Sequence, residues 1–168
     1  MDAPAFQTRQ AIPDDAPAIT AIVNDAIATT TASFWEEPRP VDEARDAIAD
    51  DPERYPWIVA IDDNGTILGF ASSKAMNPRP GYRISAEVSI YIAADARGRG
   101  VGTAIYTDLF ARLTALGYRN IIAGIALPNP ASVRLHESMG MQQVGCFKQI
   151  GVKFGEALDV GWWQVVLR

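Results

Sequence analysis

Three glycines at alternate positions, between an alternating strand and a long amphipathic helix, are the feature that constrains this chain most. Residues 84–92 alternate apolar with other side chains, which is typical of a strand with one buried face. The glycine segment Arg97–Gly102 follows, and apolar residues at helical spacing then continue to Leu116, where Gly117 predicts the helix end. Because glycine lacks a Cβ, this loop lets the backbone approach a ligand closely.

The ligand that this arrangement favours is a phosphate or pyrophosphate. A helix N-terminus offers unpaired N–H groups and the positive end of the helix dipole, and Arg97 and Arg99 add positive charge. The P-loop pattern is excluded because no Lys follows Gly100. The dinucleotide pattern is excluded because these glycines follow about the fourth strand instead of the first. A tight strand-to-helix turn without a ligand stays open as the alternative.

Composition removes several classes of function. The 168 residues contain one Cys and one His, which excludes an intrachain disulfide and a Cys- or His-rich metal site. The net charge of −5 disfavours a general nucleic-acid partner. No apolar run reaches the roughly 18 residues of a membrane helix, and the N-terminus does not resemble a secretory signal. We therefore expect a cytoplasmic protein with no metal, no nucleic acid and no membrane partner.

Periodicity and turn residues predict one domain over residues 1–168, of the α/β class, or α+β by stricter labels. We expect a central, mostly antiparallel mixed sheet flanked by about four helices. Strands are predicted at 5–12, 57–61, 66–74, 84–92, 120–127, 142–152 and 158–167, and helices from Asp14 as N-cap and at 41–50, 101–116 and 128–139. Asn64-Gly65 and Gly155 predict hairpins, and residues 29–40 and 76–82 predict loops.

Two motifs carry a resemblance to a known family. The segment Arg97–Gly102 is similar to the acetyl-CoA signature Arg/Gln-x-x-Gly-x-Gly/Ala of the GCN5-related N-acetyltransferases. The segment Asn129–Met141 resembles the second motif of that family, in the correct order along the chain. Since the element order also matches, the resemblance covers essentially the whole chain. It implies an N-acetyltransferase that uses acetyl-CoA as cosubstrate and needs no metal.

Several shorter segments resemble one branch of that family, the phosphinothricin acetyltransferases. These segments are Thr31–Phe34, Asn77–Arg83, Ala86–Ile92, Leu135-His136 and Gly151–Gly155. The branch acetylates the α-amine of phosphinothricin, methionine sulfoximine or methionine sulfone, and it implies a homodimer. The chain departs from the pattern at Met141, where Phe is usual, and at Lys74–Met76 beside the substrate loop.

Glu87 is the candidate general base. It lies in the middle of a predicted strand, where Glu is disfavoured, and Ser89 points the same way. An α-ammonium group must lose a proton before its nitrogen attacks a thioester, and a carboxylate accepts that proton directly or through water. The alternative is a solvated side chain, or a structural partner of Arg83.

His136 stands where many relatives carry a Tyr that is thought to protonate the departing thiolate. An imidazole is able to do the same or to donate a hydrogen bond to the sulfur. The alternative is a core or capping histidine on the helix.

The resemblance implies the remaining site residues. Backbone groups of Ile90, Tyr91 and Ile92 would bind the pantetheine arm, and one N–H would hold the thioester oxygen as it gains charge. Arg79 and Arg83 would clamp an acidic head group, unless they are ordinary surface arginines. The full cofactor set is Ile90, Tyr91, Ile92, Arg97, Gly98, Arg99, Gly100, Val101, Gly102, Thr103, Asn129 and Ser138. The full substrate set is Phe34, Asn77, Arg79, Arg83, Glu87 and Ser89.

Two further residue types are expected to be structural. Cys146 is predicted to be buried in a strand as a small apolar side chain. Trp162 and Trp163 face opposite sides of the last strand and are predicted to serve the core or a subunit contact.

Two alternative functions stay open at this stage. One is an acetyltransferase of the same fold acting on a protein N-terminus, a polyamine or an aminoglycoside. Polycationic acceptors would need an acidic cleft, and Arg79 and Arg83 argue against one. The other is a non-catalytic acyl-CoA-binding module, against which the presence of Glu87 and His136 argues.

Overall fold

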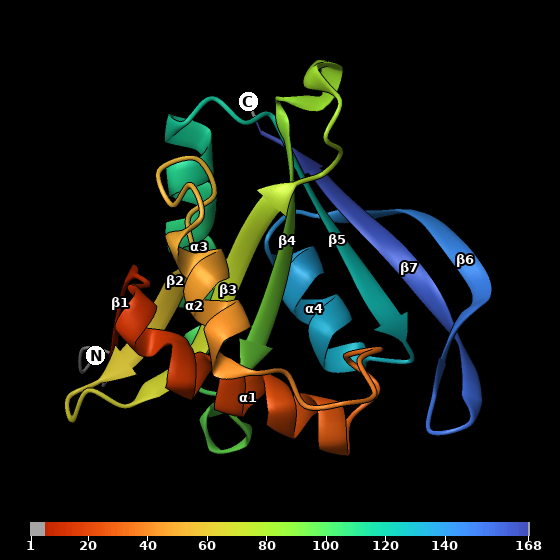
Figure 1. Cartoon of the computed structure of the whole chain (residues 1–168). Coiled ribbons are helices and arrows are strands. Elements are labelled where there is room, and N and C mark those ends of the chain that lie inside the picture. Colours follow the sequence, from red (N-terminus) through yellow and green to blue (C-terminus); the bar gives the residue numbers. More distant parts are fainter. Residues whose placement is uncertain (1–5, 168) are drawn as a thin grey trace.

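The chain builds one twisted seven-stranded sheet with helices on both faces. The computed structural model describes residues 6–167, and the strand order in the sheet is β1-β2-β3-β4-β5-β7-β6 (Figure 1). The strands are β1 (Phe6–Gln10), β2 (Ile58–Asp62), β3 (Ile67–Ala75), β4 (Ser85–Ile92), β5 (Asn120–Leu127), β6 (Gln142–Lys153) and β7 (Glu156–Val166). The β4–β5 pair is parallel and each of the other pairs is antiparallel, so the predicted mixed sheet is confirmed.

The parallel pair β4–β5 is unusually short. Its register runs only from Ser85 opposite Asn120 to Glu87 opposite Ile122, although both strands continue for five more residues. On their outer edges, β4 stays paired with β3 as far as Ile92, and β5 stays paired with β7 as far as Leu127. The sheet therefore opens between β4 and β5 while each half keeps its own ladder.

Two helical layers cover the sheet. Helices α1 (Ala16–Thr29) and α2 (Val41–Ala49) lie on one face, and α3 (Val101–Ala115) and α4 (Pro130–Ser138) lie on the other (Figure 1). Each face has its own apolar core, built with α3 around Ile105, Leu109 and Leu113, and with α1 around Ile19. Because successive side chains of a strand point to opposite faces, the same strands contribute apolar side chains to both cores.

The start of α1 differs in detail from the sequence-based expectation. Asp15, and not Asp14, is the N-cap residue, and a 3₁₀ turn at Pro13–Asp15 precedes the helix. The Asp15 carboxylate accepts two hydrogen bonds from the Arg9 guanidinium, at 2.7 and 2.8 Å, and one from the Ile12 N–H at 2.9 Å. Burial by itself would raise the pKa of this carboxyl, but these donors lower the pKa overall.

The other predicted elements are confirmed, with boundaries shifted by a few residues, and both hairpins form. Ala5 of the first predicted strand lies outside the described residues. Two burial predictions are wrong. Ile84 precedes β4 and is 40% exposed, and Cys146 is exposed because β6 is an edge strand with almost no cover. Trp163 is buried in the core, as expected.

Candidate active site

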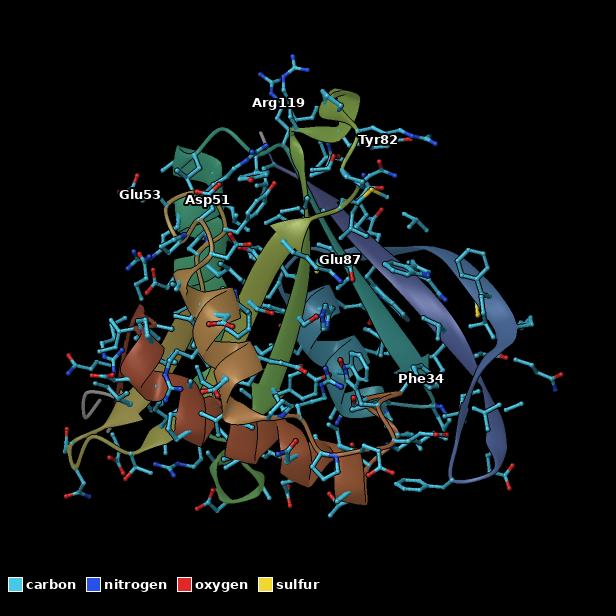
Figure 2. All side chains as sticks on the ribbon, in the orientation of Figure 1. Phe34, Asp51, Glu53, Tyr82, Glu87 and Arg119 are labelled. Carbon is cyan, nitrogen blue, oxygen red and sulfur yellow. The ribbon has the colours of Figure 1, made fainter. Side chains whose placement is uncertain are left out.

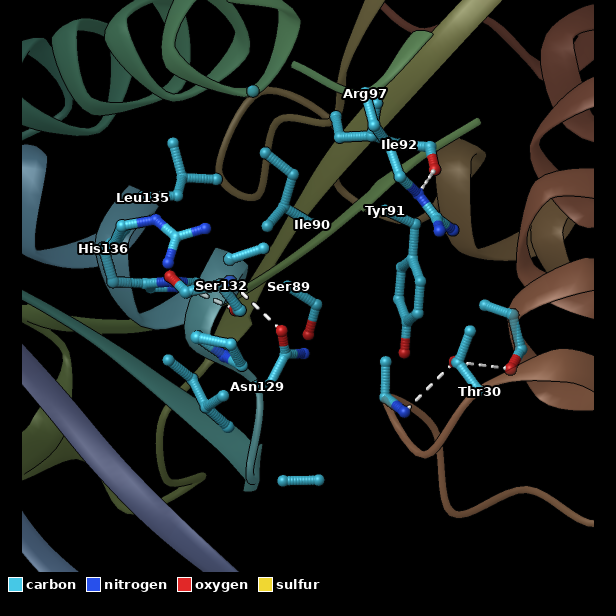
Figure 3. Close-up of a pocket in the computed structure, with 18 of the residues that line it drawn as sticks. Thr30, Ser89, Ile90, Tyr91, Ile92, Arg97, Asn129, Ser132, Leu135 and His136 are labelled. Atoms are coloured by element: carbon cyan, nitrogen blue, oxygen red, sulfur yellow. Dashed lines mark hydrogen bonds between the residues drawn. The ribbon is translucent and has the colours of Figure 1, made fainter. Parts of the chain in front are cut away.

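A cavity of about 930 Å³ occupies the opening between β4 and β5. Its walls come from both faces of the sheet, because side chains of the separated strand ends and of the surrounding loops all reach it. In Figure 3 the β4 residues lie between α4 on one side and Thr30, at the end of α1, on the other. The lining segments are 29–32, 88–92, the glycine loop with the start of α3, 124–126 and 128–138 in part.

The glycine loop has the conformation that its sequence predicts. Gly98 and Gly100 have φ angles of +74° and +80°, a region that residues with a Cβ rarely adopt. Gly100 is the N-cap of α3, so the unpaired N–H groups of the first helical turn face the cavity. Gly102 serves packing instead, because a Cβ there would lie 3.0 Å from Leu135 of α4.

Helix α4 forms a further wall of the cavity, next to the start of α3. Its N-cap Asn129 accepts a hydrogen bond from the Ser132 N–H at 3.1 Å, and Pro130 occupies the first turn. This cap fixes the second motif beside the cavity, where Asn129, Ser132 and His136 all contribute to the lining (Figure 3). Arg134 of the same helix adds a positive charge that sequence analysis missed, although it lies inside the quoted motif.

His136 is 3% exposed and has a hydrogen-bonding partner at each ring nitrogen. Its Nδ1 lies 2.8 Å from the Ser132 carbonyl oxygen and its Nε2 lies 2.9 Å from the Tyr106 hydroxyl. Burial lowers the pKa of His136, while the bond to the Ser132 carbonyl acts in the opposite direction. The ring is therefore a neutral imidazole near neutral pH.

Glu87 lies on the other face of the sheet. Alternation along β4 puts Glu87, Ser89 and Tyr91 on the α1 side, where Tyr91 stacks on Phe70. Ile90 and Ile92 pack on the α3 side. Glu87 is mid-way along β4 (Figure 2), and its carboxylate pairs with Lys74 of β3 at 3.2 Å. The ion-pair partner is thus Lys74 and not Arg83. The Lys74 side chain is largely exposed, so solvent screens this ion pair.

The segment after α1 is held against the long β6–β7 hairpin. The ring of Phe34 lies directly over Gly151, where any Cβ would collide with it. The buried Lys153 donates a hydrogen bond to the Trp35 carbonyl oxygen. Tyr91 also contacts this segment through a side-chain hydrogen bond with Ser33. Burial raises the pKa of Tyr91, and this hydrogen bond offsets part of the rise. The cavity wall at Thr29–Ala32 is therefore anchored at its far end.

The structure brings most of the predicted cofactor residues together, and fewer of the predicted substrate residues. Of the predicted set, the cavity lining contains Ser89, Ile90, Tyr91, Ile92, Arg97, Gly98, Gly100, Val101, Gly102, Thr103, Asn129, His136 and Ser138. Phe34, Asn77, Arg79, Arg83, Glu87 and Arg99 lie outside that lining. Arg79 and Arg83 sit in the exposed loop before β4, near the labelled Tyr82 in Figure 2.

These features fit the chemistry of acetyl-CoA. Positive-φ glycines and a free helix N-terminus suit its pyrophosphate, and the unpaired β4 edge suits the amide groups of its pantetheine arm. Within residues 6–167 no three His, Cys, Asp or Glu side chains gather as a metal site would require. In the same residues no helix combines the length and apolar character that crossing a membrane demands.

Comparison with known proteins shows the family of this chain. The model of the acetyltransferase (GNAT) family matches residues 21–141. The chain belongs to this family. It is an acetyl-CoA-dependent N-acetyltransferase with the fold that the glycine loop and the α4 motif predicted.

Relatives and solved structures cover nearly the whole chain. A phosphinothricin N-acetyltransferase of Streptomyces coelicolor is 37% identical over 94% of each chain. An L-methionine sulfoximine/L-methionine sulfone acetyltransferase of Pseudomonas aeruginosa is 41% identical over 91% of this chain and 90% of that protein. The crystal structure of a phosphinothricin acetyltransferase from Sinorhizobium meliloti, in complex with acetyl-CoA, is 35% identical. It superimposes with a TM-score of 0.91 over 97% of this chain and 89% of that one.

Replacing Gly100 should weaken acetyl-CoA binding. A Gly100→Ala side chain would meet open space, but φ +80° strains any residue with a Cβ. That strain is worth about 1–2 kcal/mol, so we expect the loop to relax and the affinity for acetyl-CoA to fall about tenfold. Isothermal titration calorimetry measures this.

Gly65→Ala is the matched control, because Gly65 has φ +81° and equally open surroundings in the β2–β3 turn. It should lose similar stability and keep full acetyl-CoA affinity. Equal affinities for the wild type and Gly100→Ala would show that the loop does not hold the cosubstrate.

Proposed function

We propose that this enzyme acetylates the α-amine of a small amino-acid analogue of the phosphinothricin, methionine sulfoximine or methionine sulfone type. The names of the relatives support this acceptor class. The observation that carries the proposal is the opening between β4 and β5, which is lined from both faces of the sheet. A donor bound on the α3 side and an acceptor bound on the α1 side would meet inside it.

The two faces suit the two substrates. Acetyl-CoA supplies the acetyl group as a thioester, and the glycine loop, Arg97 and α4 would hold it on the α3 side. On the α1 side, Ser89, Tyr91 and the segment Thr29–Ala32 form a smaller polar wall for an amino-acid-sized molecule. Bringing the amine and the thioester together in one opening removes much of the entropic barrier to reaction.

Glu87 acts as the base in this proposal. Its carboxylate lies on the acceptor side but outside the cavity lining, so a water molecule would relay the proton from the amine. Lys74, which stands opposite Glu87 on β3, would hold the carboxylate in place through their ion pair. Direct attack by the free amine then needs no covalent enzyme intermediate.

The other groups act on the thioester end. Backbone N–H groups of Ile90–Ile92 on the unpaired edge of β4 would donate hydrogen bonds to the thioester oxygen as negative charge develops there. His136 would stabilise the departing sulfur from α4. The clamp by Arg79 and Arg83 stays a prediction, since neither residue lines the cavity of a single chain.

The direct test is the release of coenzyme A thiol with a panel of acceptors. Phosphinothricin, methionine sulfoximine and methionine sulfone should support release, and common amino acids, spermidine, an aminoglycoside and a short peptide should not. Release only with the peptide or a polyamine would keep the family activity and reject the acceptor. Silence with every acceptor despite tight acetyl-CoA binding would favour a non-catalytic binding module. Activity on the first three would support a role in cytoplasmic detoxification of glutamate mimics.

Replacing the base should lower turnover. Glu87→Gln keeps the size of the side chain and removes its proton affinity, so we expect kcat to fall about 100-fold. The loss should be greater at low pH, where more of the acceptor amine carries its extra proton. Steady-state kinetics from pH 6 to 9 would measure this, with calorimetry showing unchanged acetyl-CoA affinity.

Glu43→Gln is the control, because Glu43 pairs with Arg39 on the exposed side of α2. It should change neither kcat nor its pH dependence. A Glu87→Gln enzyme with wild-type kcat at low pH would remove Glu87 from the mechanism.

We also propose that two copies of the chain associate through β6. This edge strand exposes large apolar side chains along its whole length, each more than half exposed. They are Val144, Phe147, Ile150, Val152 and, just after the strand, Phe154. An uncovered apolar edge strand is prone to pair with another chain, and a second copy presents the same self-complementary surface. Phe154 also lines the cavity, so this contact would close its outer side.

A charge at the centre of this strand should separate the two copies. Phe147→Glu lies outside the cavity lining, so the monomer should stay folded and bind acetyl-CoA. Light scattering after size exclusion should give twice the chain mass for the wild type and one chain mass for the variant.

Leu116→Glu is the control, since Leu116 is 49% exposed at the end of α3, and α3 packs mainly against β1, β2, β3 and β4. It should stay dimeric. A monomeric wild type at micromolar concentration would reject the proposal.

A further inference from the structure

Tyr106 is a completely buried phenol that the mechanism above does not use. It lies on α3, and its ring packs against Phe110 with ring centroids 5.0 Å apart. The Tyr106 and His136 rings pack edge to face, with ring centroids 5.2 Å apart. Its hydroxyl is 2.9 Å from His136 Nε2. A Phe ring would fill the same space, so packing alone does not explain the hydroxyl. A buried hydroxyl is costly unless it forms a hydrogen bond.

The proton positions in this pair follow from the partners. The Ser132 carbonyl oxygen accepts hydrogen bonds and cannot donate them, so the 2.8 Å contact places a proton on His136 Nδ1. In a neutral imidazole the other nitrogen is then a bare acceptor. The Tyr106 hydroxyl must therefore donate to Nε2.

Tyr106 serves this arrangement as a donor and not as a source of protons. Burial raises its pKa far above the ordinary tyrosine value, and nearby Tyr91 adds to the rise. A relay that left a tyrosinate behind would be strongly unfavourable. The hydroxyl proton thus stays on Tyr106 and forms a hydrogen bond to the lone pair of His136 Nε2.

We propose that Tyr106 is a positioning residue that holds His136 as the neutral Nδ1–H tautomer in the wall of the active site. The inference deepens the proposed function and rests on it for the role of His136 at the sulfur. Both ring nitrogens of His136 are then engaged inside the protein, so the ring lines the sulfur end of the site as a fixed neutral imidazole and does not deliver a proton from Nε2 to the thiolate. The proton on the product thiol comes from the amine or from water.

Few other groups act on this imidazole. Tyr106 faces it from α3, and the carbonyl and hydroxyl of Ser132 face it from its own helix, the hydroxyl at 3.3 Å. Among the described residues no carboxylate or cation contributes to its shift in pKa. The state of the ring is therefore set by burial and by these two neighbours.

Because His136 is the only histidine of the chain, one NMR experiment reads its state directly. The tag-free protein with ¹⁵N-labelled histidine should show a protonated Nδ1 and an unprotonated Nε2 at pH 7, with and without bound acetyl-CoA. An Nε2–H tautomer or an imidazolium at pH 7 would overturn the proposal. This measurement uses no acceptor, so it stands even if the panel shows the proposed acceptors to be wrong.

Tyr106→Phe removes only the hydroxyl. We expect the Nε2 signal to shift or exchange between states, and kcat to fall about tenfold while KM for acetyl-CoA changes little. Tyr118→Phe is the control, because that hydroxyl donates at 3.1 Å to the Arg54 carbonyl and is not part of the cavity lining. It should leave both the signals and kcat unchanged.

Two results would contradict the positioning role. One is a Tyr106→Phe protein with wild-type histidine signals. The other is shifted signals with wild-type kcat and pH profile on an acceptor that the enzyme demonstrably acetylates. If the variant does not fold, the wild-type tautomer alone decides whether Tyr106 donates to Nε2.

Discussion

The early end of the β4–β5 pairing is the constraint on which the rest of the structure depends. Three register pairs join the strands, and beyond Glu87 the two halves of the sheet separate. An unpaired backbone edge inside a protein is costly unless something else satisfies it. Here the opening holds a cavity lined by free backbone groups, a helix N-terminus and polar side chains, which is what an amide-rich thioester ligand requires.

The two outer ladders make this opening tolerable. β4 remains paired with β3 from Ala86 to Ile92, and β5 with β7 from Asn120 to Leu127, so neither strand end is loose. Separate apolar cores under α1 and α3 hold the two faces. The opening thus lies between two separately paired halves of the sheet, and alternation along β4 places Glu87 and Ile90 on opposite faces of it. Under the proposed function, a donor bound on one face and an acceptor bound on the other would meet only inside the opening.

Local patterns predicted the parts of the fold that depend on local physics. The glycine loop, the Asn129 cap and the alternation of β4 each follow from backbone geometry within a few residues. Contacts between distant segments were not readable in that way. The Tyr106–His136 pair joins residues 30 positions apart, and the exposure of Cys146 depends on β6 being the last strand of the sheet.

Pairing across strands accounts for the other differences. Periodicity put Glu87 on the correct face, but only the β3–β4 register shows that Lys74 stands opposite it. Phe34 belongs to the predicted substrate set, and no local pattern indicated that its ring packs over Gly151 of the hairpin. Registers and loop contacts of this kind are decided by the whole sheet.

Hydrogen exchange of single backbone amides is the measurement that tests the central claim most directly. Acetyl-CoA should strongly protect those amides of residues 89–92 that face the opening, together with amides of the glycine loop at 98–103. Amides of β4 that already pair with β3 should change little. Tight acetyl-CoA binding with no added protection at 89–92 would show that the opening between β4 and β5 is not where the cosubstrate binds.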